Sequence, residues 1–137
     1  MKKLFSTLAA LGLALTIGAP AMADVSPASI DGAITIDTSK ARELFEQEVA
    51  FVDVRKNSDW DAGRVPGAIH IELKKVYSAD SLGAEVAKDE PLVLYCNGES
   101  CMRSSAATAK AVEWGWNKVY YYRDGFPAWK AAGNPVE

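Results

Sequence analysis

The chain has 137 residues and a formal net charge of −3 at pH 7, which suits one modest domain without a basic surface. Nucleic acid and anionic membranes attract proteins through clustered Lys and Arg, so neither is an expected partner. The two cysteines and the single histidine fall short of a zinc ligand set. We therefore expect neither a metal nor another cofactor.

Residues 1–23 have the pattern of a cleaved secretory signal peptide. Lys2 and Lys3 precede a nearly continuous apolar run over residues 4–17, and residues 21–23 form an Ala-Met-Ala cleavage sequence. A membrane anchor is the alternative, but it needs roughly 20 apolar residues, and this run is shorter. We therefore predict a periplasmic or secreted protein, with no stable membrane insertion after the signal is removed.

Downstream of the signal, residues 24–33 form a polar lead-in that is expected to be loosely ordered, followed by one domain over residues 34–137. Within this domain, short apolar runs typical of strands alternate with the spacing typical of helices. The polar residues 37–39 offer N-cap side chains for the first helix. In chain order the patterns predict a strand at 34–36, a helix at 40–48, a strand at 50–54, a helical turn at 57–62, a turn with a short strand at 65–71, a helix at 78–86, a strand at 92–95, a helix at 103–114, a strand at 119–122 and a helix at 126–132.

The alternation of strands and helices predicts an α/β domain with a parallel sheet that helices cover on both faces. Continuous apolar runs at 50–54 and 92–95 are typical of strands buried on both sides. In such sheets, ligand sites form at the carboxyl ends of the strands. The residues that follow these two runs are therefore the first candidates for a functional site.

Both cysteines lie in one short loop that follows the predicted strand at 92–95. Cys96 comes directly after this strand, and Arg103 begins the next helical pattern. The thiolate is the nucleophilic form of cysteine, and a helix N-terminus and a nearby cation both lower the pKa of the thiol. This placement makes Cys96 the candidate nucleophile. A purely structural disulfide with Cys101 is disfavoured, because one short loop of this kind is too little to stabilise a domain.

Four segments, in this order, resemble the signatures of the rhodanese family of single-domain sulfurtransferases. They are Phe-Val-Asp-Val-Arg at 51–55, Trp-Asp-Ala-Gly-Arg-Val-Pro-Gly-Ala at 60–68, Tyr-Cys at 95–96 with Arg-Ser-Ser-Ala-Ala at 103–107, and Asp-Gly-Phe-Pro-Ala-Trp at 124–129. They resemble the family's Asp-x-Arg signature, its Gly-His-Ile-Pro-Gly-Ala turn, its active-site loop with the following helix, and its Gly-Gly-x-x-x-Trp ending. Arg64 stands where the family has histidine, and Asp124 replaces the first glycine.

The resemblance implies an open five-stranded parallel sheet flanked by helices, and a sulfur-transfer chemistry. Cys96 would take sulfane sulfur from a small anionic donor such as thiosulfate, become a persulfide, and pass the sulfur to a thiol or cyanide-like acceptor. A protein acceptor or reductant is a further candidate partner. Backbone N–H groups of the loop and the start of the helix would stabilise the anion, and Arg103 would add a fork of donors suited to an oxyanion.

The residues around Cys96 are expected to take part in this chemistry. Arg103 and Cys101 are the other expected catalytic residues, while Asp53 and Arg55 are expected to organise the site. The expected substrate-binding loop consists of Asn97, Gly98, Glu99, Ser100, Met102 and Ser104.

Two features of the loop leave other functions open. Arg103 lies seven positions after Cys96, farther than in the family's short sulfurtransferase loop, which allows cysteine phosphatase or arsenate reductase chemistry as an alternative. Cys101 lies between these two residues, and the sequence allows three roles for it: disulfide partner, sulfur relay or bystander. A Cys96–Cys101 disulfide would suit a non-enzymatic binding or redox-sensing module, which is the main alternative to a sulfurtransferase.

Overall fold

A computed structural model of the chain describes residue 18 and residues 25–137. The predicted signal peptide at 1–23 lies, apart from Gly18, outside the described residues. In the part of the chain that is described, no helix is both long and apolar enough to cross a membrane. The elements are β1 (Ala33–Thr35), α1 (Thr38–Glu46), β2 (Ala50–Asp53), α2 (Asn57–Ala62), β3 (Ile69–His70), α3 (Ala79–Glu85), β4 (Leu92–Tyr95), α4 (Arg103–Glu113), β5 (Val119–Tyr122) and α5 (Gly125–Ala131).

The five strands form one sheet in the order β1-β5-β4-β2-β3, and every neighbouring pair is parallel. The predicted open, five-stranded parallel sheet is therefore confirmed. β4 is its central strand, and Tyr95 at the end of β4 pairs with Asp53 on one side and Tyr122 on the other. The carboxyl ends of β2, β4 and β5 are thus level with one another, and the residues that follow them meet at one edge.

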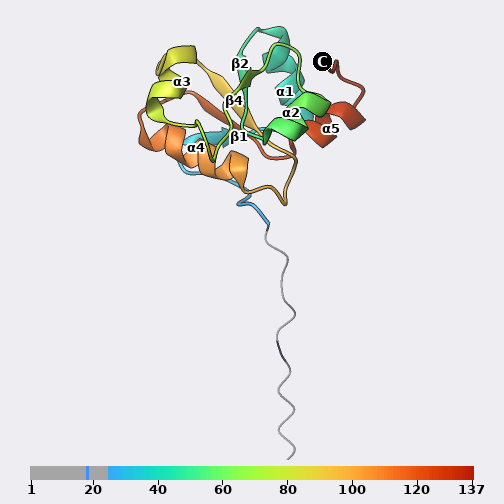
Figure 1. The fold of residues 1–137 in the computed structure, drawn as a ribbon, viewed down its shortest axis with the longest axis horizontal. Coiled ribbons are helices and arrows are strands. Elements are labelled where there is room, and N and C mark those ends of the chain that lie inside the picture. The colour runs from blue at the N-terminus through green and yellow to red at the C-terminus, as the bar shows by residue number, and fades with distance from the viewer. Residues whose placement is uncertain (1–17, 19–24) are drawn as a thin grey trace, which may run out of the picture.

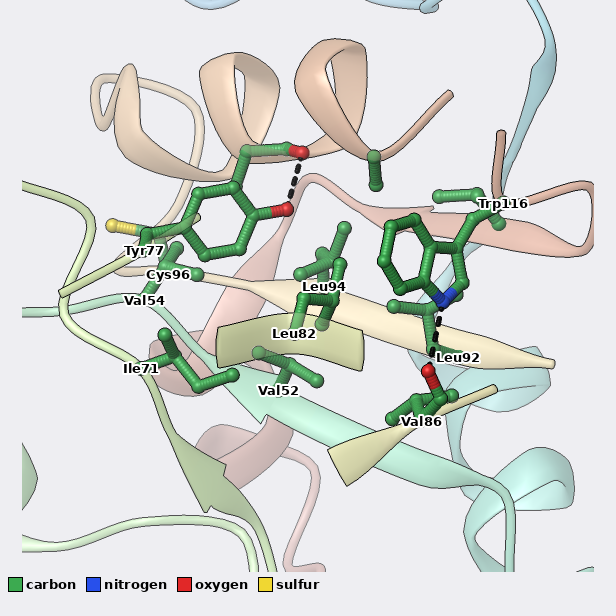
Figure 2. Packing of buried hydrophobic residues seen from close by; sticks show 13 residues of the cluster. Val52, Val54, Ile71, Tyr77, Leu82, Val86, Leu92, Leu94, Cys96 and Trp116 are labelled. Atoms are coloured by element: carbon green, nitrogen blue, oxygen red, sulfur yellow. Dashed lines mark hydrogen bonds between the residues drawn. The ribbon is translucent and has the colours of Figure 1, made fainter. Parts of the chain in front are cut away.

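Helices cover both faces of the sheet (Figure 1). α3 and α4 lie on one face, whereas α1 and α5 lie on the other with α2 beside them. Each side has its own apolar core because side chains alternate along a strand. In β4, Leu94 packs in the core under α3 and α4 (Figure 2), whereas Val93 packs in the core under α1 and α5. β4 is buried along its whole length, which confirms that it is covered on both faces.

The segment that precedes β1 is bound to the domain at several points. The backbone N–H and the hydroxyl of Ser26 both donate to the carbonyl of Glu99, each at 2.7 Å. Arg123 Nη2 donates to the carbonyl of Ser26 at 2.8 Å, and Tyr121 donates to the carbonyl of Pro27 at 3.0 Å. These contacts differ from the loose order expected of residues 24–33. Ser26 donates to the loop after β4, whereas the carbonyls of Ser26 and Pro27 accept from the side chains of Arg123 and Tyr121.

Candidate functional site

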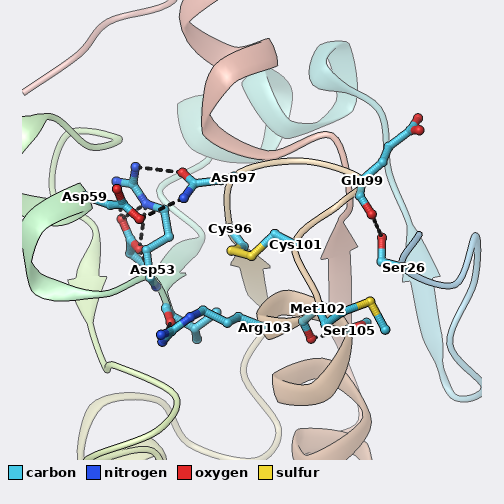
Figure 3. The surroundings of a disulfide bond; sticks show 12 residues. Ser26, Asp53, Asp59, Cys96, Asn97, Glu99, Cys101, Met102, Arg103 and Ser105 are labelled. Atoms are coloured by element: carbon cyan, nitrogen blue, oxygen red, sulfur yellow. Dashed lines mark hydrogen bonds and ion pairs between the residues drawn. A yellow bond between two sulfur atoms is a disulfide. The ribbon is translucent and has the colours of Figure 1, made fainter. Parts of the chain in front are cut away.

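The loop that carries the cysteines leaves the sheet at the carboxyl end of β4 and returns to the start of α4. Cys96 is fully buried, whereas Cys101 is partly exposed. The two are joined by a disulfide with their Cα atoms 6.3 Å apart (Figure 3). Gly98 allows the tight turn between them, because its φ of 111° lies in the region that favours glycine. Of the roles considered for Cys101, the structure places it as a disulfide partner.

Beside this loop, Asp53 and Arg55 form a buried ion pair at the end of β2. Arg55 Nη2 and Nε donate to the Asp53 carboxylate at 2.7 and 3.0 Å, and Tyr95 donates its hydroxyl to the same carboxylate at 2.7 Å. Burial by itself would lower the pKa of Arg55, but the hydrogen bonds and the charge of Asp53 together raise it. The guanidinium is therefore held in its charged form next to the loop.

Asn97 connects this ion pair to the cysteine loop. Arg55 Nη1 donates to Asn97 Oδ1 at 3.2 Å, and Asn97 Nδ2 donates to Asp59 Oδ2 at 2.8 Å. Both contacts are visible beside the disulfide in Figure 3. The residue next to Cys96 is thus held by Arg55, which follows β2, and by Asp59 of α2.

Arg103 is expected from the sequence to bind an oxyanion, and in the structure it forms hydrogen bonds with other groups of the protein. Its Nη1 donates to the carboxylate of Glu72 and to the carbonyl of Val54 at 3.3 Å, and Figure 3 shows the Arg103 side chain below the disulfide. With the disulfide formed, Nη1 of Arg103 is therefore paired with the Glu72 carboxylate.

A family model described as the rhodanese-like domain matches residues 37–132. The chain belongs to the rhodanese-like domain family. This confirms the resemblance seen in the sequence motifs. A search of the solved structures agrees with the fold: the rhodanese-like domain of the Anabaena protein Alr3790 superposes with a TM-score of 0.65 at 24% identity, covering 75% of this chain and 77% of that one.

Curated relatives of this rhodanese-like domain include both an enzyme and a regulator. The chain is 31% identical over 98 residues to the thiosulfate sulfurtransferase GlpE of Pseudoalteromonas translucida, covering 71% of this chain and 89% of that enzyme. It is 36% identical over 119 residues to the HTH-type transcriptional regulator Rv0324 of Mycobacterium tuberculosis, covering 87% of this chain but 50% of the regulator. The chain thus spans half the length of that regulator. The sulfurtransferase relatives support sulfur-transfer chemistry in general.

Within this rhodanese-like domain, the loop residues expected to bind substrate do not all face the same way. Ser104 lies at the start of α4 and is fully buried. The Glu99 side chain is 60% exposed and lies 3.4 Å from Arg123 Nη1, so its charge is directed away from the sulfur atoms (Figure 3). Gly98 is partly exposed, and the exposed loop residues are Asn97, Glu99, Ser100 and Met102.

Several residues of the site were not found from the sequence. Glu72 holds Arg103, Asp59 holds Asn97, and Ser26 holds the carbonyl of Glu99. Each comes from a segment far along the chain from the loop, and none carries a motif of its own. Only Glu72 could have been suspected from the sequence. It follows a predicted strand closely, so its carboxylate can reach the edge of the sheet that carries the cysteine loop.

The Glu72–Arg103 pair gives a testable dependence of stability on pH. The hydrogen bond from Arg103 holds the pKa of Glu72 below its usual 4.5, against the opposing effect of burial. A carboxyl with a lowered folded-state pKa stabilises the fold above its unfolded-state pKa, and this contribution is lost as the pH falls through the folded-state value. We expect Glu72→Gln to lower the free energy of unfolding by about 1–3 kcal/mol at pH 7 and by less at pH 4. Urea unfolding at both pH values measures this; an equal loss at both would contradict it.

Proposed function

We propose that this rhodanese-like domain is a sulfurtransferase that carries sulfane sulfur on Cys96, from a donor such as thiosulfate to a thiophilic acceptor. The observation that carries the proposal is the position of Cys96: it follows the central strand β4 directly, at the carboxyl edge of a parallel sheet, where such sheets bind ligands. The similarity to proteins named thiosulfate sulfurtransferase supports it.

The chemistry follows from a thiolate at this position. The Cys96 thiolate attacks the outer sulfur of thiosulfate, a new S–S bond forms, and sulfite leaves with the electron pair of the broken bond. An acceptor such as cyanide then attacks the outer sulfur of the persulfide, forms thiocyanate and returns the thiolate. The start of α4, two residues after Cys101, supports the thiolate through the positive end of the helix dipole.

The disulfide bears on this chemistry because it occupies the nucleophile. Cys96 Sγ is bonded to Cys101 Sγ, so the disulfide must be reduced before Cys96 can accept sulfur. Disulfides persist in exported proteins, and the signal-like sequence at 1–23 leads us to include a periplasmic or secreted location in the proposal.

A discontinuous assay and a mass measurement test the proposal. Protein reduced and then freed of reductant should release sulfite from thiosulfate, and it should form thiocyanate when cyanide is also present. Cys96→Ser should lose both properties. Cys101→Ser, the matched replacement in the same loop, should still take up sulfur. Thiocyanate formation by Cys96→Ser at the wild-type rate would refute the assignment, and hydrolysis of an aryl phosphate without sulfur uptake would favour phosphatase chemistry.

A redox-sensing module is the second candidate function. Two observations favour it, namely the Cys96–Cys101 disulfide and the similarity to a protein named as a transcriptional regulator. Thiol counting on protein isolated without reductant tests this candidate. A sensor should be isolated in a mixture of dithiol and disulfide that follows the redox potential of the buffer and should not react with thiosulfate. A free Cys96 that reacts with the donor would count against it.

A further inference from the structure

Resting on the proposed function, we propose that Cys101 resolves the Cys96 persulfide, so that the enzyme releases its sulfur as hydrosulfide and finishes the cycle in the disulfide form. The Cys101 thiolate attacks Cys96 Sγ, the bond between Cys96 Sγ and the outer sulfur breaks, and hydrosulfide leaves with its electron pair. The new bond is the Cys96–Cys101 disulfide. Atoms and electrons balance without an external oxidant, because the sulfane sulfur is reduced while the two cysteines are oxidised.

The geometry of the loop selects this step. Cys101 Sγ lies in bonded contact with Cys96 Sγ, which is the inner sulfur of a persulfide. An attack on the inner sulfur releases hydrosulfide, whereas an attack on the outer sulfur would only move the sulfane sulfur to Cys101. The Cα separation of 6.3 Å lies within the usual range for a disulfide. The position that Cys101 takes is therefore the one that resolution requires.

Contacts other than the disulfide also hold the two cysteines together. Asn97 is bound by Arg55 and Asp59, and the carbonyl of Glu99 receives two hydrogen bonds from Ser26. The N–H of Cys101 donates to the carbonyl of Gly98 at 3.0 Å. These contacts do not involve the sulfur atoms, so they remain available to hold the loop when the disulfide is reduced. An attacking group held in this way has a high effective concentration, so resolution proceeds when no dissolved acceptor is present.

The different exposure of the two cysteines indicates how the cycle restarts. Cys96 is fully buried, whereas Cys101 is partly exposed, so an incoming thiol reaches Cys101 Sγ first. Attack there forms a mixed disulfide with Cys101 and frees Cys96 as the thiolate, which is the form that attacks the donor. A dithiol partner then completes the exchange with its second thiol. The net reaction of thiosulfate with a dithiol gives sulfite, sulfide and the oxidised partner.

A single turnover without an acceptor tests the proposal. Wild-type protein, reduced and freed of reductant under anaerobic conditions, receives one equivalent of thiosulfate, and sulfite, sulfide and the intact mass are measured. We expect sulfite and sulfide in equal amounts, and a protein lighter than the dithiol form by two hydrogen atoms. Cys101→Ser should release sulfite, retain one added sulfur on Cys96 and release no sulfide. Cys96→Ser should give none of these products.

The outcomes separate this inference from the proposed function. Wild-type protein that keeps the added sulfur and releases no sulfide would overturn the resolving role while leaving the sulfurtransferase intact. Peptide mapping that finds the added sulfur on Cys101 would also overturn it, because the outer sulfur would then have been attacked. If neither wild type nor Cys101→Ser releases sulfite or gains sulfur, the proposed function itself fails.

Discussion

Asp53→Ala is expected to lower the free energy of unfolding by about 3–5 kcal/mol, because it leaves a buried charge without its partner. Arg55 has a side chain that is 3% exposed, and the Asp53 side chain is 0% exposed. Removal of the carboxylate also leaves the hydroxyl of Tyr95 without the acceptor that it has at 2.7 Å. Since small domains are stable by only about 5–15 kcal/mol, a large part of the total stability is at risk. Urea unfolding at pH 7 measures the loss.

Two further variants show whether the unpaired charge causes this loss. Asp61→Ala makes the same chemical change at an exposed position of α2 and should cost no more than about 0.5 kcal/mol. The double variant Asp53→Ala/Arg55→Met removes both charges and should be more stable than Asp53→Ala alone, because an ion pair can be replaced by apolar groups at little cost. A double variant that is no more stable than the single one would show that lost packing is responsible.

The fold could be predicted from the sequence because its signals are local. The strands at 92–95 and 119–122 have the predicted bounds, since an apolar run of that length is too short for a helix and suits a buried strand. The first helix begins at Thr38 instead of residue 40, because Asp37 is the residue that caps it, accepting the N–H of Lys40 at 2.8 Å. The exact start of a helix depends on which polar residue caps it, and each of residues 37–39 could have been the cap.

The candidate site could be predicted only in part, because its partners lie far apart in the chain. The sequence correctly placed Cys96 at the edge of the sheet, since the strand before it is unambiguous. It could not show that Arg103 pairs with Glu72, which lies 31 positions away, or that Ser26 binds Glu99 from 73 positions away. Proximity in sequence favoured Arg103 as an anion ligand for the loop, but a buried carboxylate from another strand end competes for the same guanidinium. Such competition is decided by tertiary packing.

Gly125→Ala is expected to destabilise both the fold and the loop that carries Cys96. Gly125 has a φ of 66°, a conformation that costs a residue with a Cβ about 1–2 kcal/mol. A Cβ at this position would also collide with the carbonyl of Cys96 and with the backbone N of Gly98. The N–H of Phe126 donates to the same carbonyl at 2.9 Å, so α5 is docked directly onto Cys96, the proposed nucleophile. Strain and the lost hydrogen bond together should cost about 2–4 kcal/mol.

Gly133→Ala separates the collision from the strain. Gly133 has a φ of 78°, but a Cβ there would meet no atom within 4 Å. This variant should therefore lose only the cost of the left-handed conformation and should keep the wild-type rate of sulfur uptake. Gly125→Ala should in addition slow sulfite release from thiosulfate, because the loop must move to make room for the methyl group. Equal losses of stability in the two variants, with unchanged sulfite release in both, would mean that the close approach of Gly125 to Cys96 does not fix the position of the Cys96 thiol.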